Sequence, residues 1–278
     1  MNIRTMTPAD IPLGMKLSAQ NGWNQLEADW RRQLDLEPAG CFLAERDGVG
    51  VGTACACVFG SVAWIALVLV DANQRGQGIG TTLMKHVLDW LDARGVPSVR
   101  LDATPLGRPI YEKLGFVAEF TLHRFAWVLP AMAEAPSPVV GASDADLAGI
   151  MALDQQVTGT DRSRLLKRLY QERPEEMRLV RGRAGIDGFV AARPGARASQ
   201  IGPCAGSAPA CRQLLEDACR RHAGESVFLD VPEDNAAAVA VASALGLTVQ
   251  RALVRMGRGP TVKEDRAAFW TGFGPEKG

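Results

Sequence analysis

The residues with the clearest chemical potential follow the apolar run 62–70, where Arg75, Gly76, Gly78 and Gly80 fall within a short segment. Glycines let backbone amides approach a ligand closely, and a helix that begins after them adds the positive end of its dipole. Several N–H groups in such a turn converge on one point. The pattern predicts a binding site for phosphate oxygens that needs no metal.

Two other phosphate-binding patterns fit this turn poorly. A P-loop requires a lysine, and the turn contains none. A dinucleotide-binding fingerprint requires Gly-x-Gly-x-x-Gly directly after its strand, but the third glycine would fall at Thr81 or Leu83. Asp102 does imitate the ribose-binding acid, since it lies at a predicted strand end about twenty residues further on.

The elements that must position the turn alternate along the chain. The continuously apolar residues 62–70 are typical of a strand covered on both faces. Apolar residues recur at helical spacing over 79–91, and Gly95 and Pro97 end that helix. Helices that alternate with strands predict an α/β fold, in which a mixed sheet is flanked by helices.

The pattern Arg75-x-x-Gly-x-Gly after a buried strand resembles the acyl-CoA signature of the GNAT superfamily of N-acetyltransferases. After the next predicted strand, Tyr111-Glu-Lys-Leu-Gly-Phe resembles the second motif of that superfamily. The motifs come in the family's order, and the resemblance covers most of residues 1–129. It implies a mostly antiparallel mixed sheet with a splayed cleft for acetyl-CoA.

The resemblance also implies roles for individual residues, with acetyl-CoA as the acyl donor and no metal. Main chain in the turn would hold the CoA diphosphate, and main chain of the preceding strand would hold the pantetheine arm. Tyr111 would be the general acid toward the leaving thiolate, and Trp23 and Asn24 would shape the acceptor pocket. Core packing would also explain either aromatic residue. The implied cofactor-binding residues are Leu69, Val70, Arg75, Gly76, Gln77, Gly78, Ile79, Gly80 and Thr81.

The predicted site differs from the catalytic residues of many family members in two ways. Thr104 stands where many family members carry an asparagine. The sequence identifies no general base, because Glu27, Asp29, Glu45 and Asp102 are candidates by position alone. A water relay, or an amine that arrives neutral, would make a base unnecessary.

Prolines concentrate in residues 130–138, which predicts a linker between a catalytic domain at 1–129 and a second domain at 139–257. The two halves share a layout, so the second is predicted to be a diverged GNAT-like copy. Prolines occupy its counterpart of the glycine turn, and Ala242 stands at the expected tyrosine position, so we expect it to be weak or silent. Residues 258–278 are predicted to be a C-terminal tail whose aromatic part docks.

Composition restricts the class of partner. The 31 Lys+Arg and 31 Asp+Glu give a formal net charge of zero, which argues against a nucleic-acid partner. The six cysteines form no Cys-x-x-Cys pair and the three histidines are scattered, so no metal site is expected. The longest apolar run is far shorter than the ~20 residues of a membrane helix. We expect a cytoplasmic protein without a membrane partner, either a monomer with an internal pseudo-dimer or a homodimer.

The resemblance therefore implies an acetyl-CoA-dependent enzyme that acetylates a primary amine of a small molecule. The alternative is a non-catalytic sensor or scaffold that binds CoA. Thr104 and the missing base favour the alternative, whereas Tyr111 opposes it.

Overall fold

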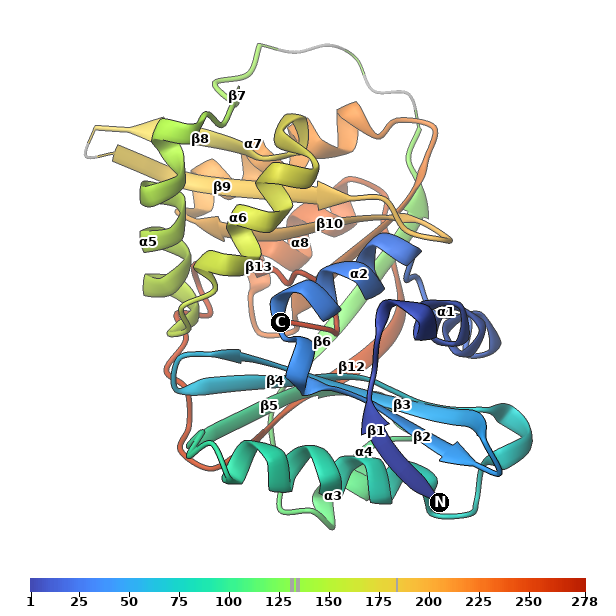
Figure 1. The fold of residues 1–278 in the computed structure, drawn as a ribbon. Helices are drawn as coiled ribbons and strands as arrows, with labels where there is room; N and C mark the ends of the chain where they lie inside the picture. The colour runs from blue at the N-terminus through green and yellow to red at the C-terminus, as the bar shows by residue number, and fades with distance from the viewer. Residues whose placement is uncertain (131–132, 134–135, 184) are drawn as a thin grey trace.

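The computed structural model describes residues 1–130, 133, 136–183 and 185–278, and its helices and strands repeat in one order in the two halves (Figure 1). The first half contains β1 (Asn2–Thr5), α1 (Ile11–Gln20), α2 (Glu27–Leu36), β2 (Cys41–Arg46), β3 (Val49–Phe59), β4 (Val62–Val70), α3 (Ile79–Asp92), β5 (Ser98–Ala103), α4 (Arg108–Glu112) and β6 (Val117–Val128). The second half contains β7 (Val140–Gly141), α5 (Leu147–Thr158), α6 (Ser163–Glu172), β8 (Arg178–Gly182), β9 (Gly185–Arg193), β10 (Ser199–Gly206), α7 (Ala208–Arg221), β11 (Ser226–Pro232), α8 (Ala236–Ala244) and β12 (Thr248–Arg258). A short strand, β13 (Phe269–Thr271), follows the repeat. The repeated order confirms the predicted duplication.

The strands of the described residues join into one mixed sheet, in the order β1-β2-β3-β4-β5-β12-β6-β11-β10-β9-β8-β7, with β13 paired to β10. Among these described strands, the β4–β5 and β10–β11 pairs are parallel and the other pairs are antiparallel. The predicted α/β fold with a mostly antiparallel mixed sheet is therefore confirmed, although the sheets of the two halves are continuous.

The halves exchange strands at the centre of this sheet. β12, which belongs to the second half, lies between β5 and β6 and pairs antiparallel with both. β6, which belongs to the first half, pairs in turn with β11 of the second. The predicted linker at 130–138 lies partly outside the described residues, and the sheet joins the strands on either side of it.

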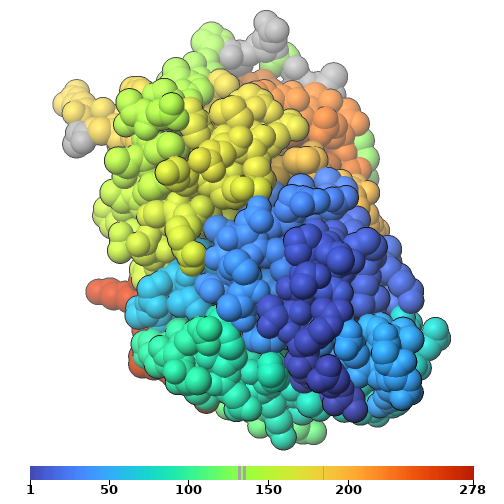
Figure 2. Space-filling model, viewed as in Figure 1, coloured from blue at the N-terminus to red at the C-terminus, as the bar shows by residue number. Residues whose placement is uncertain are grey.

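Helices cover both faces of the sheet. In the first half, α3 covers one face and α1 and α2 cover the other. In the second half, α7 and α8 pack on one face and α5 and α6 on the other. A core shared by both halves joins Trp64 with Leu165 and Phe189. The surfaces of the two halves meet along α2 and α6, where Arg32 Nη2 lies 2.6 Å from Glu172 Oε2 (Figure 2).

Local sequence explains the elements nearest the predicted site. The helical stripe on α3 is buried, including Ile79, Leu83 and Val87, as its spacing predicts. β4 has the bounds of the apolar run and is buried along most of its length. Among the described residues, no helix is long and apolar enough to cross a membrane.

The C-terminal segment lies at the centre of the molecule (Figure 1). Its aromatic residues Phe269, Trp270 and Phe273 are each at most 1% exposed. Asn235, at the start of α8, holds the segment by donating to Phe269 O at 3.0 Å. The docking that the aromatic residues predict is therefore deep burial between the two halves.

Candidate functional site

A cleft opens where β4 and β5 separate. The strands pair in parallel only from Val62 to Trp64 on β4. Further along, a bulge shifts the register of β4 against β3, and Leu67 adopts a φ of +53°. Thr53 Oγ1 donates to Leu67 O at 2.8 Å and so fixes the bulge. The strands consequently splay apart, as the fold resemblance implies.

The glycine turn stands before α3 and presents unused backbone donors. Gly76 and Gly78 both have a φ of +76°, a conformation that favours glycine. A Cβ added at either position would meet no atom within 4 Å, so this face of the turn is open. Within the described residues, the N–H groups from Gly76 to Thr81 have no protein acceptor. The turn is therefore arranged to bind an anion through its main chain.

Arg75 has a different position from its glycine neighbours. Its Nη2 donates to Asn21 Oδ1 at 2.7 Å, at the end of α1. This contact ties the turn to the C-terminal end of α1.

α4 carries Tyr111 to the cleft. Thr104 supports the preceding loop, because its carbonyl oxygen and its Oγ1 both accept from Gly107 N, at 3.0 and 3.2 Å. Gly107 lies so close to the tyrosine ring that a Cβ there would come within 2.8 Å of Tyr111 Cε2. Burial raises the pKa of Tyr111 to about 12. The phenol is therefore protonated at neutral pH.

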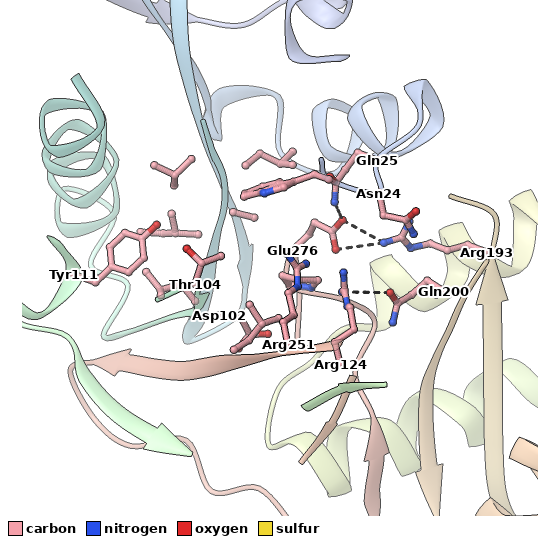
Figure 3. A pocket seen from close by; sticks show the side chains of 18 residues that line it. Asn24, Gln25, Asp102, Thr104, Tyr111, Arg124, Arg193, Gln200, Arg251 and Glu276 are labelled. Atoms are coloured by element: carbon pink, nitrogen blue, oxygen red, sulfur yellow. Dashed lines mark hydrogen bonds and ion pairs between the residues drawn. The ribbon is translucent and has the colours of Figure 1, made fainter. Parts of the chain in front are cut away.

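A pocket at this cleft encloses about 590 Å³ of empty space, part of it open to solvent. Both halves of the chain contribute to its wall (Figure 3). The first half supplies Trp23, Asn24, Gln25, Ile65, Ala66, Leu67, Val68, Leu101, Asp102, Thr104, Tyr111 and Arg124. The second half supplies Arg193, Gln200, Arg251, Leu253, Pro275 and Glu276.

The structure thus brings Tyr111, Trp23 and Asn24 to one pocket, as the resemblance implies. Leu69 and Val70 do not line it, because the wall from β4 consists of residues 65–68. They lie instead between this wall and the glycine turn along the chain. Gln77 belongs to the turn. Ile79 is the first residue of α3, and its side chain is buried in the core.

Asn24 closes the pocket against the second half. Its Nδ2 donates to Ala198 O at 2.8 Å, and its Oδ1 accepts from Arg197 N at 2.9 Å and Ala198 N at 3.1 Å. Its amide is therefore occupied by the loop between β9 and β10. Trp23, which is partly exposed, remains available as an apolar wall.

The four carboxylates proposed as bases are all ion-paired. Asp102 Oδ1 and Oδ2 accept from Arg255 at 2.9 and 3.0 Å. Asp29 is bound by two arginines, Glu45 lies 2.7 Å from Arg4, and Glu27 lies 2.7 Å from Arg31 at the surface. Only Asp102 lines the pocket.

Three arginines line the side of the pocket away from Tyr111 (Figure 3). Arg124 Nη2 lies 2.6 Å from Asp230 Oδ2, and both side chains are buried. Arg193 Nη2 lies 3.2 Å from Glu276 Oε1, and this ion pair outweighs the effect of burial and lowers the pKa of Glu276. Sequence reasoning missed these residues because each is a single charge in a strand or tail, with no motif around it.

In the described part of the second half, β13 lies where the first half has its opening. β10 and β11 pair only at Ser199 and Gln200, which mirrors the separation of β4 and β5. Here, however, β13 pairs with β10, and Gly272 N donates to Asp230 O of β11 at 2.9 Å. β10 also leads into α7 without an intervening glycine turn. Within the described residues, no group of His, Cys, Asp or Glu side chains is arranged to hold a metal ion.

Comparison with protein families matches both halves. The acetyltransferase (GNAT) family model matches residues 15–116, and a second acetyltransferase (GNAT) domain model matches residues 150–271. The first match spans the glycine turn and Tyr111, and the second spans β13.

Individual proteins are more distantly similar. The holothin acyltransferase of a Pseudoalteromonas species is 24% identical over 213 residues, which are 76% of this chain and 71% of that protein. The mycothiol acetyltransferase of Thermomonospora curvata is 38% identical over 103 residues, only 35% of this chain and 34% of that protein. Among solved structures, a Pyrococcus horikoshii protein provisionally classed as an acetyltransferase superposes with a TM-score of 0.86 at 24% identity, covering 100% of this chain and 95% of that one.

Proposed function

The chain belongs to the GNAT superfamily of N-acetyltransferase enzymes as a tandem member, and we propose that it transfers acetyl from acetyl-CoA to the amine of a small molecule. The observation that carries this proposal is the cleft between β4 and β5. The glycine turn follows β4, and the pocket at the cleft, built by both halves, contains Tyr111 in its wall.

The residues present fit acetyl-CoA. The turn offers open, unpartnered N–H groups from Gly76 to Thr81 at the positive end of α3, and these would hold the diphosphate. The separated edges of β4 and β5 leave room for an extended arm beside them. When bound, acetyl-CoA supplies an activated thioester for attack by an amine.

Tyr111 is the proposed proton donor in the reaction. Its phenol stays protonated because burial raises its pKa to about 12. Burial is the sole cause of that shift. A phenol in this state suits donation to a leaving thiolate.

The acceptor is proposed to bind as a neutral amine, because the pocket offers no free carboxylate to deprotonate it. Asp102 is held by Arg255 and Glu276 by Arg193. The pocket is concave and is lined by apolar side chains together with a few charged and polar ones, as small-molecule sites are. The relatives named for holothin and mycothiol also support a small-molecule acceptor.

The second half is proposed to be silent toward acetyl-CoA and to complete the acceptor pocket. β13 occupies the position between β10 and β11 that stays open in the first half. The shared sheet also supports a monomer with an internal pseudo-dimer as the functional unit.

The test combines calorimetric titration with acetyl-CoA and a thiol-release assay over a panel of amines. We expect one binding site per chain and amine-dependent thiol release. Binding without transfer to any amine would favour the sensor or scaffold alternative. If titration showed no binding, the proposal would be wrong.

A further inference from the structure

An unusual charge pairing crosses the pocket wall. In the β6–β12 ladder, Arg251 is the direct cross-strand partner of Arg124. In the adjoining β6–β11 ladder, Arg124 is the partner of Asp230. Like charges placed directly opposite one another destabilise a sheet. Across the three strands, the single carboxylate of Asp230 is therefore available to two arginines, Arg124 and Arg251.

Ion pairing leaves Arg251 as the surplus cation. Asp230 is bound by Arg124 through both carboxylate oxygens, at 2.7 and 2.6 Å. The other charged residues of the pocket wall, Asp102, Arg193 and Glu276, also have partners. Among the described residues, Arg251 forms no ion pair, and its buried Nε has no hydrogen-bond acceptor.

The environment of Arg251 makes this charge costly. Burial, and then the neighbouring Arg124, lowers the pKa of Arg251 to about 10, against an ordinary value above 12. A guanidinium in these surroundings gains much from an anion that enters the pocket, because its ion pair would be poorly screened.

The position of Arg251 indicates that an anionic group bound there would belong to the acceptor rather than to acetyl-CoA. Arg251 lies beside Arg124 on the side of the pocket that faces the second half, whereas Tyr111 lies across the pocket (Figure 3). The glycine turn, which would hold the donor's phosphates, lies between β4 and α3 and contributes no residue to the wall of this pocket. Donor and acceptor anions would therefore have separate sites.

We propose that the acceptor amine carries a carboxylate or phosphate group and that Arg251 binds this group. The proposal rests on the function proposed above and names the class of its second substrate. Arg251 is then a specificity-determining residue, and Arg124, whose Nη1 donates to no acceptor among the described residues, offers a further hydrogen-bond donor beside it.

Matched amines test the substrate class. Each of the common amino acids is compared with its carboxamide, and phosphoethanolamine with ethanolamine, in the thiol-release assay with acetyl-CoA. A charge-assisted hydrogen bond predicts that the anionic member of the best pair has roughly 10- to 100-fold higher kcat/KM. The amino-acid and phosphate arms distinguish the two anions.

Variants test the residue. Arg251→Gln should raise KM for the anionic acceptor roughly 10- to 100-fold with little change in kcat, and Arg251→Lys should recover part of the loss. Arg258→Gln is the matched control, because Arg258 lies on the same strand but pairs with Asp92 at 2.9 Å outside the pocket. Calorimetry without acetyl-CoA should show the same weakening of acceptor binding in Arg251→Gln.

Stability gives a second readout that does not need an acceptor. Removing one of two opposed arginines should leave the melting temperature of Arg251→Gln equal to or above that of the native protein. Equal activity on anionic and neutral amines, unchanged in Arg251→Gln, would overturn this inference and leave the proposed transferase intact. Absence of transfer to every amine would overturn both.

Discussion

Replacing Tyr111 by phenylalanine tests the proposed chemistry with the smallest possible change. The ring packs against Phe116, with centroids 6.1 Å apart, and phenylalanine preserves this contact. Burial is the only cause of the raised pKa, and the substitution removes nothing but the hydroxyl. We expect the free energy of unfolding to change by less than about 1 kcal/mol.

Turnover should respond much more strongly. Loss of a general acid lowers kcat by ~10²-fold or more, and acetyl-CoA affinity should stay nearly unchanged because the glycine turn is untouched. The assay is steady-state thiol release, with acetyl-CoA binding measured by calorimetry.

The sequence offers a matched control, since its two tyrosines are Tyr111 and Tyr170. Tyr170→Phe should retain full turnover and leaves Tyr111 as the sole phenol in the chain. The pKa of about 12 then predicts that only about one-tenth of that phenol is ionised at pH 11, as measured by ultraviolet absorbance. An ordinary pKa near 10 would give about nine-tenths.

The raised pKa of Tyr111 also predicts how the stability of the fold depends on pH. Because folding raises the pKa of Tyr111, its contribution to stability is complete below pH ~10 and is lost as the pH rises through about 12. Unchanged turnover in Tyr111→Phe, or a phenolate midpoint near pH 10 in Tyr170→Phe, would refute the role assigned to this residue.

Three further predictions concern the turn, the C-terminal segment and a buried histidine. Gly78→Val forces a branched side chain into a φ of +76° and should weaken acetyl-CoA binding at least ~10-fold, as measured by calorimetry. The control Gly95→Val, at a φ of +64° beyond α3, should carry similar backbone strain without weakening acetyl-CoA binding. Asn235→Ala removes the α8 cap and the donor to Phe269 O, so denaturant unfolding should show a loss of about 2–4 kcal/mol, against almost none for the exposed Ser243→Ala. The carboxylates of Glu176, at 3.5 Å, and Glu225, at 2.8 Å, raise the pKa of His222 despite burial. The stabilisation from these contacts should be complete below pH ~6.5 and be lost as the pH rises through the raised pKa, so melting curves of native protein and His222→Gln should converge as the pH rises to 9. A gap that widened with pH would contradict this.

Features that depend on adjacent residues could be predicted from the sequence. The apolar run of β4, the buried stripe of α3 and the glycines between them form one continuous stretch, and their physical meaning is local. The same holds for Tyr111, whose motif follows the next strand. The repeated order of elements was also visible, because each half carries its own helix and strand signals.

Features that depend on strand pairing could not be predicted in this way. An apolar pattern shows that β12 is a strand but does not show which sheet it enters, so its place between β5 and β6 came only from the structure. For the same reason, nothing near Arg124 or Arg251 in the sequence shows that the two face each other. The aromatic residues of the tail predicted docking, but they did not indicate that Glu276 would reach the pocket.

The crossing of β6 and β12 determines how this molecule responds to being cut. If the backbone were cut between Leu129 and Val139, neither fragment would contain all the strands of its part of the sheet. β12 of the second fragment pairs with β5 and β6 of the first, and β6 of the first pairs with β11 of the second. The pieces should remain associated after the cut and should reassemble when produced separately. The natural joint between the two copies is thus a ready place to divide the protein into complementing fragments, and neither fragment would make an independent enzyme.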